Sequence, residues 1–344
     1  MNQRWLKICF ALLFAGAAAF FLWAYPDEKE LRYYHNHGNV FGTYYNIRYE
    51  ATKDLEKDIL SALKDFDGSL SSFNKKSTIS HINQNKSDKT DLYFEQMYST
   101  AEKVWQLSNG AFDITVAPLV NAWGFGFKNK ENVSQCLIDS LRQYVGMEKI
   151  CLQRHRLIKT DNNVMLDASA IAKGQACDVV ASLLKDKGCS NLLVDIGGEV
   201  VLQGVNDEGK PWRVGITKPI DDITGTQNEL QEIISSTSLA MATSGNYRQF
   251  YYENGVRRSH TIDPRSGYPV NHTLLSATVI AADCMTADAL ATACMVLGKD
   301  SAMLMIGKAD DTECYLIYSC NDTTAVCMTE GMQKILFADE GKSL

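Results

Sequence analysis

The chain has 344 residues, of which 45% are hydrophobic and 22% are charged, an ordinary globular balance that excludes collagen, coiled coil and wholesale disorder. Its 34 basic and 41 acidic residues give a net charge of −7, so no broad basic surface is present to bind nucleic acid. We therefore expect no nucleic-acid partner.

The first 26 residues are predicted to be a signal peptide or signal anchor. Arg4 and Lys7 precede an uncharged stretch from Ile8 to Tyr25, and acidic residues follow from Asp27 onward. This charge order predicts that the N-terminus stays inside and the main body lies outside. The stretch is long for a signal-peptide core and short for a spanning helix. An uncleaved anchor is the favoured interpretation, with cleavage near Ala17–Ala19 and a buried core helix as the alternatives.

The rest of the chain is predicted to be one composite α+β domain, residues 39–338, after a polar linker at 27–38 and before a tail at 339–344. The predicted elements, read from helical and alternating patterns, are a strand at 40–49, helices at 55–70, 92–107 and 134–145, strands at 149–153, 156–160 and 164–166, a helix at 169–187, strands at 192–196, 199–203, 212–217, 231–236, 247–252 and 275–281, helices at 285–297 and 299–307, and paired strands over 313–329. Residues 74–90 are polar and are predicted to be a loop. No repeat or low-complexity linker divides the domain, which favours mixed or antiparallel sheets with packed helices.

The first of four segments with side chains suited to chemistry is Gly-Ala-Phe-Asp at 110–113. It follows the predicted end of a helix, which places Asp113 on a loop or at a strand start. A carboxylate beside an aromatic ring can hydrogen-bond a planar heterocycle while the ring packs on it. A helix C-cap followed by a turn aspartate is the alternative.

The second segment runs from Leu166 to Gly174. A strand ends here, and Asp167 or Ser169 is predicted to cap the next helix. Free N–H groups at a helix start can bind an anion, and Lys173 adds positive charge. Plain capping beside a surface lysine is the alternative. Neither a Walker A sequence nor G-x-G-x-x-G is present, so a nucleotide would be held in a non-Rossmann manner.

The third segment, Ser259 to Gly267, contains an Asp-Pro-x-x-Gly turn that leaves His260 at the end of a strand. A histidine in this place can move protons near neutral pH, and a purely structural histidine is the alternative. Asp263 and Arg265 make the segment denser in functional groups than a simple turn requires.

The fourth segment places Asp288 and Thr292 four residues apart on a predicted helix, so that both face the same side. A carboxylate and a hydroxyl form a sparse set of hard oxygen ligands. Such a set suits Mg²⁺, which keeps its other positions for water and phosphate oxygens. The alternative is an aspartate near the helix start that interacts favourably with the helix dipole, beside a threonine that is merely packed.

Six short motifs in one order resemble the ApbE family of FAD:protein FMN transferases, from Val40 to about Phe337. They are Gly-Ala-Phe-Asp at 110–113, Ala-Lys-Gly at 172–174, Asp-Ile-Gly-Gly at 195–198, Ser-Gly at 244–245, Ser-His-x-Ile-Asp-Pro-x-x-Gly at 259–267 and Ala-Asp-x-x-Ala-Thr at 287–292. The resemblance implies a T-fold-like domain. It also implies Mg²⁺-dependent transfer of the FMN moiety of FAD to a Thr or Ser hydroxyl of a partner protein. A phosphoester forms and AMP is released.

The resemblance also implies roles for individual residues. His260 matches the histidine that assists proton removal from the acceptor hydroxyl. Asp288, Thr292 and the backbone carbonyl of Ala170 match the Mg²⁺ ligands. The positions that match contacts with FAD are Phe41, Phe73, Ala111, Phe112, Asp113, Asp167, Lys173 and Ile262.

The implied partners are flavin-acceptor subunits of membrane electron-transfer complexes with a motif similar to D-x-x-[ST]-G-A-[ST]. This chain contains no such stretch, so we expect a separate acceptor. With the N-terminal segment, the resemblance implies a place at the bacterial inner membrane, with the catalytic domain on the periplasmic side, or secretion to the periplasm after cleavage. Two other functions would use the same site: an FAD pyrophosphatase that yields FMN and AMP, and a non-catalytic FAD-binding protein.

Overall fold

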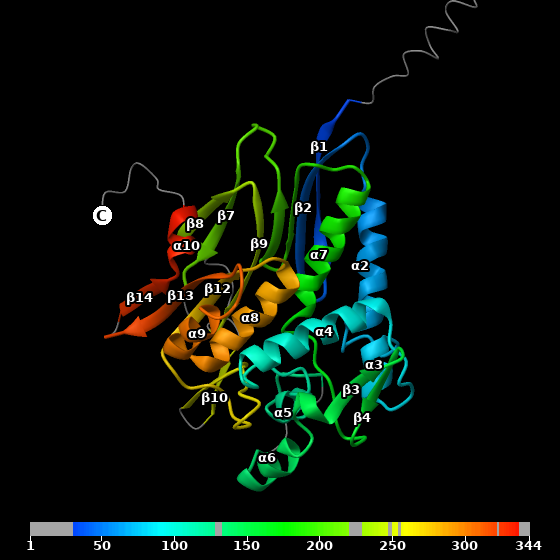
Figure 1. Cartoon of the computed structure of the whole chain (residues 1–344), viewed down its shortest axis with the longest axis vertical. Helices are drawn as coiled ribbons and strands as arrows, with labels where there is room; N and C mark the ends of the chain where they lie inside the picture. Colours follow the sequence, from blue (N-terminus) through cyan, green and yellow to red (C-terminus); the bar gives the residue numbers. More distant parts are fainter. Residues whose placement is uncertain are drawn as a thin grey trace, which may run out of the picture.

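Figure 1 shows a computed structural model of the chain, in which several helices lie over one face of a large sheet. The structure describes residues 30–127, 133–219, 229–246, 250–253, 256–321 and 323–336. The predicted signal or anchor at 1–26 and the predicted tail at 339–344 lie outside these ranges. Within them, no helix is both long and apolar enough to cross a membrane.

The central sheet has eight strands in the order β1-β2-β5-β6-β9-β12-β13-β14, and every neighbouring pair is antiparallel. The strands are β1 (Arg32–Val40), β2 (Thr43–Ala51), β5 (Leu192–Ile196), β6 (Glu199–Gln203), β9 (Ser238–Gly245), β12 (Leu274–Ile280), β13 (Glu313–Cys320) and β14 (Thr323–Met328). Separate hairpins pair β3 (Ile150–Gln153) with β4 (Arg156–Lys159), β7 (Trp212–Thr217) with β8 (Leu230–Ser236), and β10 (Phe250–Glu253) with β11 (Val256–Ser259). The predicted α+β class is confirmed.

Helices and a hairpin cover the two faces of this sheet. Helices α7 (Ala172–Asp186) and α8 (Cys284–Leu297) pack on one face, and α2 (Glu56–Leu70), α4 (Leu92–Leu107) and α9 (Lys299–Ile306) flank them (Figure 1). Their apolar side chains form the main core with residues such as Ile47 and Leu290. On the other face, β7, β8 and α10 (Glu330–Ile335) enclose a second core around Trp212 and Tyr315.

Short helices complete the lower part of the molecule in Figure 1. They are α3 (Thr78–Asn83), α5 (Ala117–Ala122), α6 (Gln135–Arg142) and the 3₁₀ helix η1 (Met147–Lys149). A third, smaller core joins α5 and α6 to the segment after β11 through Leu119, Trp123, Ile138 and Ile262. The indole N–H of Trp123 also donates to the carbonyl of Gly267 at 2.9 Å, which fixes that segment against α5.

Helices α7 and α8 approach each other closely at Gly174. A Cβ added there would overlap the carbonyl group of Cys284 and lie 2.8 Å from Cβ of Asp288. The Gly174 N–H instead donates to Oδ2 of Asp288 at 3.0 Å. One turn further along α7, Asp178 accepts hydrogen bonds from the N–H groups of Cys284 and Met285, at 3.0 and 2.8 Å. These contacts fix the start of α8 against α7.

Two expectations about polar segments are wrong. Residues 32–38 of the predicted linker belong to β1, because their polar side chains find partners on the sheet: the hydroxyl of Tyr49 donates to the buried Asn36 at 2.8 Å. The predicted loop at 74–90 contains α3, which begins after Ser77, whose side chain accepts a hydrogen bond from the N–H of Ser80. In both segments, polar side chains that form hydrogen bonds interrupt the apolar pattern on which the prediction depended.

The predicted cap of the helix at 169–187 is also wrong. Helix α7 begins at Ala172, and no side chain caps it. The carboxylate of Asp167 accepts a hydrogen bond from the Ser169 N–H at 2.9 Å and forms a turn before the helix. The first turn of α7 therefore follows a compact loop.

Gly174→Ala is predicted to destabilise the fold by about 1–3 kcal/mol, because the added methyl group would overlap the backbone of α8. Gly68→Ala is the matched control, since Gly68 lies in α2 and nothing lies within 4 Å of a Cβ added there. That change should stabilise the helix by roughly 0.5–1 kcal/mol. Urea unfolding followed by circular dichroism measures both. Equal stability of Gly174→Ala and the wild type would contradict the close approach.

Candidate active site

A cleft of about 1310 Å³ collects side chains from segments far apart in the sequence. Parts of β2, β5, β6, β7 and β9, the start of α7 and one side of α8 line it. Eleven of the twelve residues assigned by resemblance lie on this lining. The exception is Phe41, at the turn between β1 and β2, whose ring packs against Phe66 with centroids 5.8 Å apart. The structure thus gathers the predicted catalytic, flavin and metal positions at one place.

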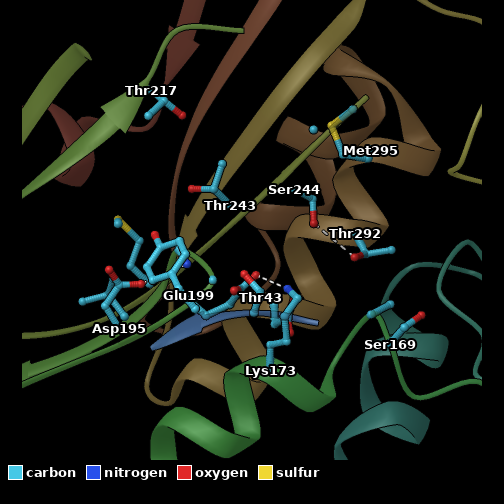
Figure 2. A pocket seen from close by; sticks show the side chains of 18 of the residues that line it. Thr43, Ser169, Lys173, Asp195, Glu199, Thr217, Thr243, Ser244, Thr292 and Met295 are labelled. Carbon is cyan, nitrogen blue, oxygen red and sulfur yellow. Dashed lines mark hydrogen bonds and ion pairs between the residues drawn. The ribbon is translucent and has the colours of Figure 1, made fainter. Parts of the chain in front are cut away.

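The proposed metal ligands lie on α8 and just before α7. Asp288 is buried, and its Oδ2 is held by the N–H of Gly174 at 3.0 Å. The hydroxyl of Thr292 lies 3.2 Å from that of Ser244 on β9 (Figure 2). Ala170 lines the same cleft. A carboxylate, a hydroxyl and a carbonyl are hard oxygen ligands, so this donor set fits Mg²⁺.

The described part of the chain holds no group of three or more His, Cys, Asp or Glu side chains that could bind a metal ion. A metal in the cleft would therefore depend on this mixed set of ligands, together with oxygens of water or of a bound phosphate. Such a site is sparse by the standard of a structural metal centre. That the cation is shared with a phosphate-bearing ligand stays a prediction.

Lys173 and Glu199 form an ion pair between α7 and β6, in which Nζ meets Oε1 (Figure 2). The carboxyl side chain is 2% exposed and the lysine side chain 33%. Burial lowers the pKa of Lys173, but Asp288 and Glu199 raise it by more, so the pKa lies above its ordinary value. The ammonium therefore stays charged and offers the cleft a fixed positive charge for a phosphate.

Glu199 was not among the predicted site residues. It begins β6, directly after the Asp-Ile-Gly-Gly motif, and three apolar residues, 200–202, follow it. An acidic residue at the head of a buried strand is the signal that could have found it, because a buried carboxylate needs a partner. Its partner, Lys173, is 26 positions earlier in the sequence, and only the tertiary fold brings the two together.

Asp113 organises the loop that brings Ala111 and Phe112 to the cleft. Its carboxylate accepts hydrogen bonds from the N–H and hydroxyl of Thr115 at 2.7 and 2.6 Å and from the N–H of Met147 at 3.1 Å. Burial raises its pKa from 3.8 to about 6, although these hydrogen bonds oppose the shift. Asp113 thus has the structural role considered as an alternative, and it also lines the cleft.

The loop of Asp113 lies beside the loop of Asp167. The N–H of Asp167 donates to the carbonyl of Ile114 at 2.7 Å, and Val116 forms a parallel bridge with Met165. Burial raises the pKa of Asp167 as well. Two motifs more than fifty residues apart therefore form one wall of the cleft.

His260 follows directly after β11, as predicted, and lines the cleft. Its ring meets that of Phe125 edge to face, with centroids 6.4 Å apart. The hydroxyl of Thr261 donates to Asn246 at 2.7 Å, which ties the histidine segment to the end of β9. Asp263 and Arg265 pair with each other at 2.9 Å in the following turn, and neither lines this cleft. The two charged side chains of this segment therefore serve the turn.

The raised pKa of Asp113 predicts a pH dependence of stability. Between pH 3.8 and about 6 the unfolded chain loses this proton while the folded chain keeps it, so wild-type stability should fall as pH rises. The slope should be at most about 1.4 kcal/mol per pH unit for this group. Asp113→Asn should lose this component.

Denaturant unfolding of the wild type and Asp113→Asn across pH 4–7 measures the two slopes. Asp186→Asn, at an exposed position at the end of α7, is the control and should keep the wild-type slope. Identical slopes for the wild type and Asp113→Asn would show that burial does not raise the pKa of the Asp113 carboxyl group.

Comparison with known proteins gives consistent similarities. Residues 41–316 match the ApbE family. The FAD:protein FMN transferase of Vibrio cholerae serotype O1 is 38% identical over 305 residues, which cover 83% of this chain and 90% of that protein. The FAD:protein FMN transferase of Haemophilus influenzae is 36% identical, with 84% of this chain and 88% of that protein covered.

Solved structures show the same similarity. The flavin transferase ApbE from Vibrio cholerae has a TM-score of 0.80 and 35% identity, covering 89% of this chain and 100% of that one. The apo form of the Pseudomonas stutzeri flavinyl transferase ApbE also has a TM-score of 0.80. It is 28% identical, and the match covers 90% of this chain and 98% of that chain. The likeness extends over the whole cleft-bearing body.

Proposed function

Because the chain belongs to the ApbE family, we propose that it transfers the FMN moiety of FAD to a hydroxyl group of a partner protein. The observation that carries this function is the meeting of His260, Lys173, Asp288 and Thr292 on one cleft. A proton acceptor, a fixed cation and a hard-oxygen set are the groups that phosphoryl transfer to a hydroxyl requires. The curated relatives carry the name of this activity.

In the proposed reaction, a Thr or Ser hydroxyl of the acceptor attacks the phosphorus of the FMN half of FAD. A new phosphorus–oxygen bond forms, the bond to the AMP phosphate breaks, and AMP leaves with the electron pair. His260, directly after β11 and on the lining of the cleft, takes the hydroxyl proton. Lys173 offsets negative charge on the pyrophosphate.

Mg²⁺ is the proposed metal, held by Asp288, Thr292 and the carbonyl of Ala170. When bound, it would neutralise charge on the phosphates during the departure of AMP. The hydrogen bond from Gly174 orients the Asp288 carboxylate, and the contact with Ser244 positions the Thr292 hydroxyl. The chain thus supplies a small preformed set of oxygens.

The flavin is proposed to lie along the wall formed by the loops of Asp113 and Asp167. Phe112 and Ile262 line the cleft with apolar side chains, and Phe73 adds a ring that is 75% exposed. An exposed aromatic side chain beside a cleft is suited to packing on a planar ring. Phe41 would act indirectly, through its packing on Phe66.

The proposed partners are flavin-acceptor subunits of membrane electron-transfer complexes that carry the D-x-x-[ST]-G-A-[ST]-like motif. The proposed location is the bacterial inner membrane, with the catalytic domain on the periplasmic side. The charge order around the apolar stretch at 8–25 supports that orientation. The absence of the motif from this chain supports a separate acceptor.

His260→Ala is predicted to slow transfer about 100- to 10,000-fold, because the acceptor hydroxyl loses its proton acceptor. Affinity for FAD should change much less than the rate. Transfer is measured as the mass increase of an acceptor protein with time, and FAD affinity by quenching of flavin fluorescence.

His155→Ala is the matched control, because His155 is exposed in the turn between β3 and β4, away from the cleft. It should leave both quantities unchanged. Equal losses of transfer rate and FAD affinity in His260→Ala would make His260 a binding residue and contradict its role in proton transfer.

A further inference from the structure

The ion pair between Lys173 and Glu199 sits beside the proposed metal ligand Asp288. Lys173 precedes Gly174, whose N–H holds Oδ2 of Asp288 at 3.0 Å. Lys173, Glu199 and Asp288 all line the same cleft, and the charge of Asp288 acts on both members of the ion pair. One ammonium group therefore lies near two buried carboxylates, and it contacts Glu199.

Glu199 is held firmly at this place. Glu199 is the first residue of β6, where it pairs with Ile196 of β5 after the Gly197–Gly198 turn. The thiol of Cys177 donates to its carbonyl at 3.1 Å, which anchors the strand to α7. Its second oxygen, Oε2, is buried and has no hydrogen-bond partner among the described residues. Among the side chains of the described residues, Lys173 is the hydrogen-bond partner of this carboxylate.

The lysine has more freedom than its partners. Its side chain is 33% exposed and flexible, with four carbon atoms between the backbone and the ammonium group. Removal of one member of a buried pair leaves the other charge uncompensated, and that charge seeks another partner. Asp288 is the other carboxylate whose charge acts on Lys173. An ammonium group paired with Asp288 would compete directly with a divalent cation for this carboxylate.

We propose that Glu199 is a positioning residue that holds Lys173 away from Asp288 and so keeps this carboxylate available to a divalent cation. The proposal rests on the metal site of the proposed function. It gives the Lys173–Glu199 pair a role that neither residue has alone: the ammonium remains in the cleft for a phosphate without occupying the metal ligand. Glu199 acts through Lys173 and needs no contact with the reacting atoms.

The test measures binding of Mn²⁺, which stands in for Mg²⁺, to the full-length protein without nucleotide. The electron paramagnetic resonance signal of free Mn²⁺ reports its affinity. Glu199→Gln keeps the shape of the side chain but removes its charge, and should weaken Mn²⁺ binding about tenfold, the order expected for one charge pair in a partly solvated cleft. The double variant Lys173→Met with Glu199→Gln should return the affinity to within about twofold of the wild type.

Two further variants separate position from charge. Glu199→Asp keeps the charge on a shorter side chain that reaches Lys173 less well, and should weaken Mn²⁺ binding about threefold or more. Asp288→Asn is the control that removes the metal ligand and should abolish the binding. Thermal unfolding of each variant checks that the fold is retained, because Lys173→Met would also relieve any loss of stability caused by an uncompensated ammonium group.

Each outcome is decisive. Wild-type affinity in Glu199→Gln, no recovery in the double variant, or wild-type affinity in Glu199→Asp would overturn the positioning role while leaving the proposed function intact. Mn²⁺ binding by the wild type that does not depend on Asp288 would overturn the metal site of the proposed function, and the role of Glu199 with it. Weakening in both single variants at Glu199, together with recovery in the double variant, would support the proposal.

Discussion

The close contact between α7 and α8 at Gly174 is the constraint on which the cleft depends. A side chain at this position would collide with α8, so only glycine lets the first turn of α7 come near enough to hydrogen-bond Asp288. The contact sets the place of Lys173 from one helix and of Asp288 and Thr292 from the other. Asp178 reinforces this contact by accepting hydrogen bonds from two N–H groups at the start of α8. The position of the charged groups is therefore a property of helix packing.

The electrostatic character of the cleft follows from this arrangement. Asp113, Asp167, Asp195 and Glu199 all line it, and burial raises the pKa of each. The raised pKa values favour the neutral form of these carboxyl groups, and those that are ionised repel a pyrophosphate unless cations compensate them. Lys173 is one such cation. Arg48 and Arg213 also line the cleft, and a divalent ion at the proposed site on Asp288 would add to their positive charge.

The sequence predicts best those elements whose burial leaves a regular apolar pattern. Strands β5 and β6 are runs of Val, Leu and Ile bounded by the Gly197–Gly198 turn, and their predicted limits match the structure. Helix α4 also matches, because its apolar face repeats at helical spacing and Gly110 follows it. Each of these elements carries its own signal in the order of its residues.

The elements that were missed lack such a signal. Strand β9 was not predicted because its small residues, Ser-Leu-Ala-Met-Ala-Thr-Ser-Gly, contain few of the β-branched or aromatic side chains typical of strands. β1 and α3 are polar and depend on hydrogen bonds with distant partners, such as that from Tyr49 to Asn36. The motifs contain most of the predicted residues that line the cleft. The ion pair between Lys173 and Glu199 and the one between Asp263 and Arg265 are seen only in the folded structure. Phe41, a predicted flavin contact, is not part of the cleft lining and packs on Phe66.

The most direct test of the account is mass spectrometry of an acceptor protein after incubation with the full-length chain, FAD and Mg²⁺. The acceptor carries the D-x-x-[ST]-G-A-[ST] motif, has been shown to accept flavin from another transferase, and is compared with a variant in which alanine replaces the motif hydroxyl residue. The account predicts one FMN moiety added to the intact acceptor, none added to the variant, and AMP formed in step with the adduct. Release of FMN and AMP without an adduct would contradict it and identify a pyrophosphatase, and bound FAD that never turns over would identify a binding protein.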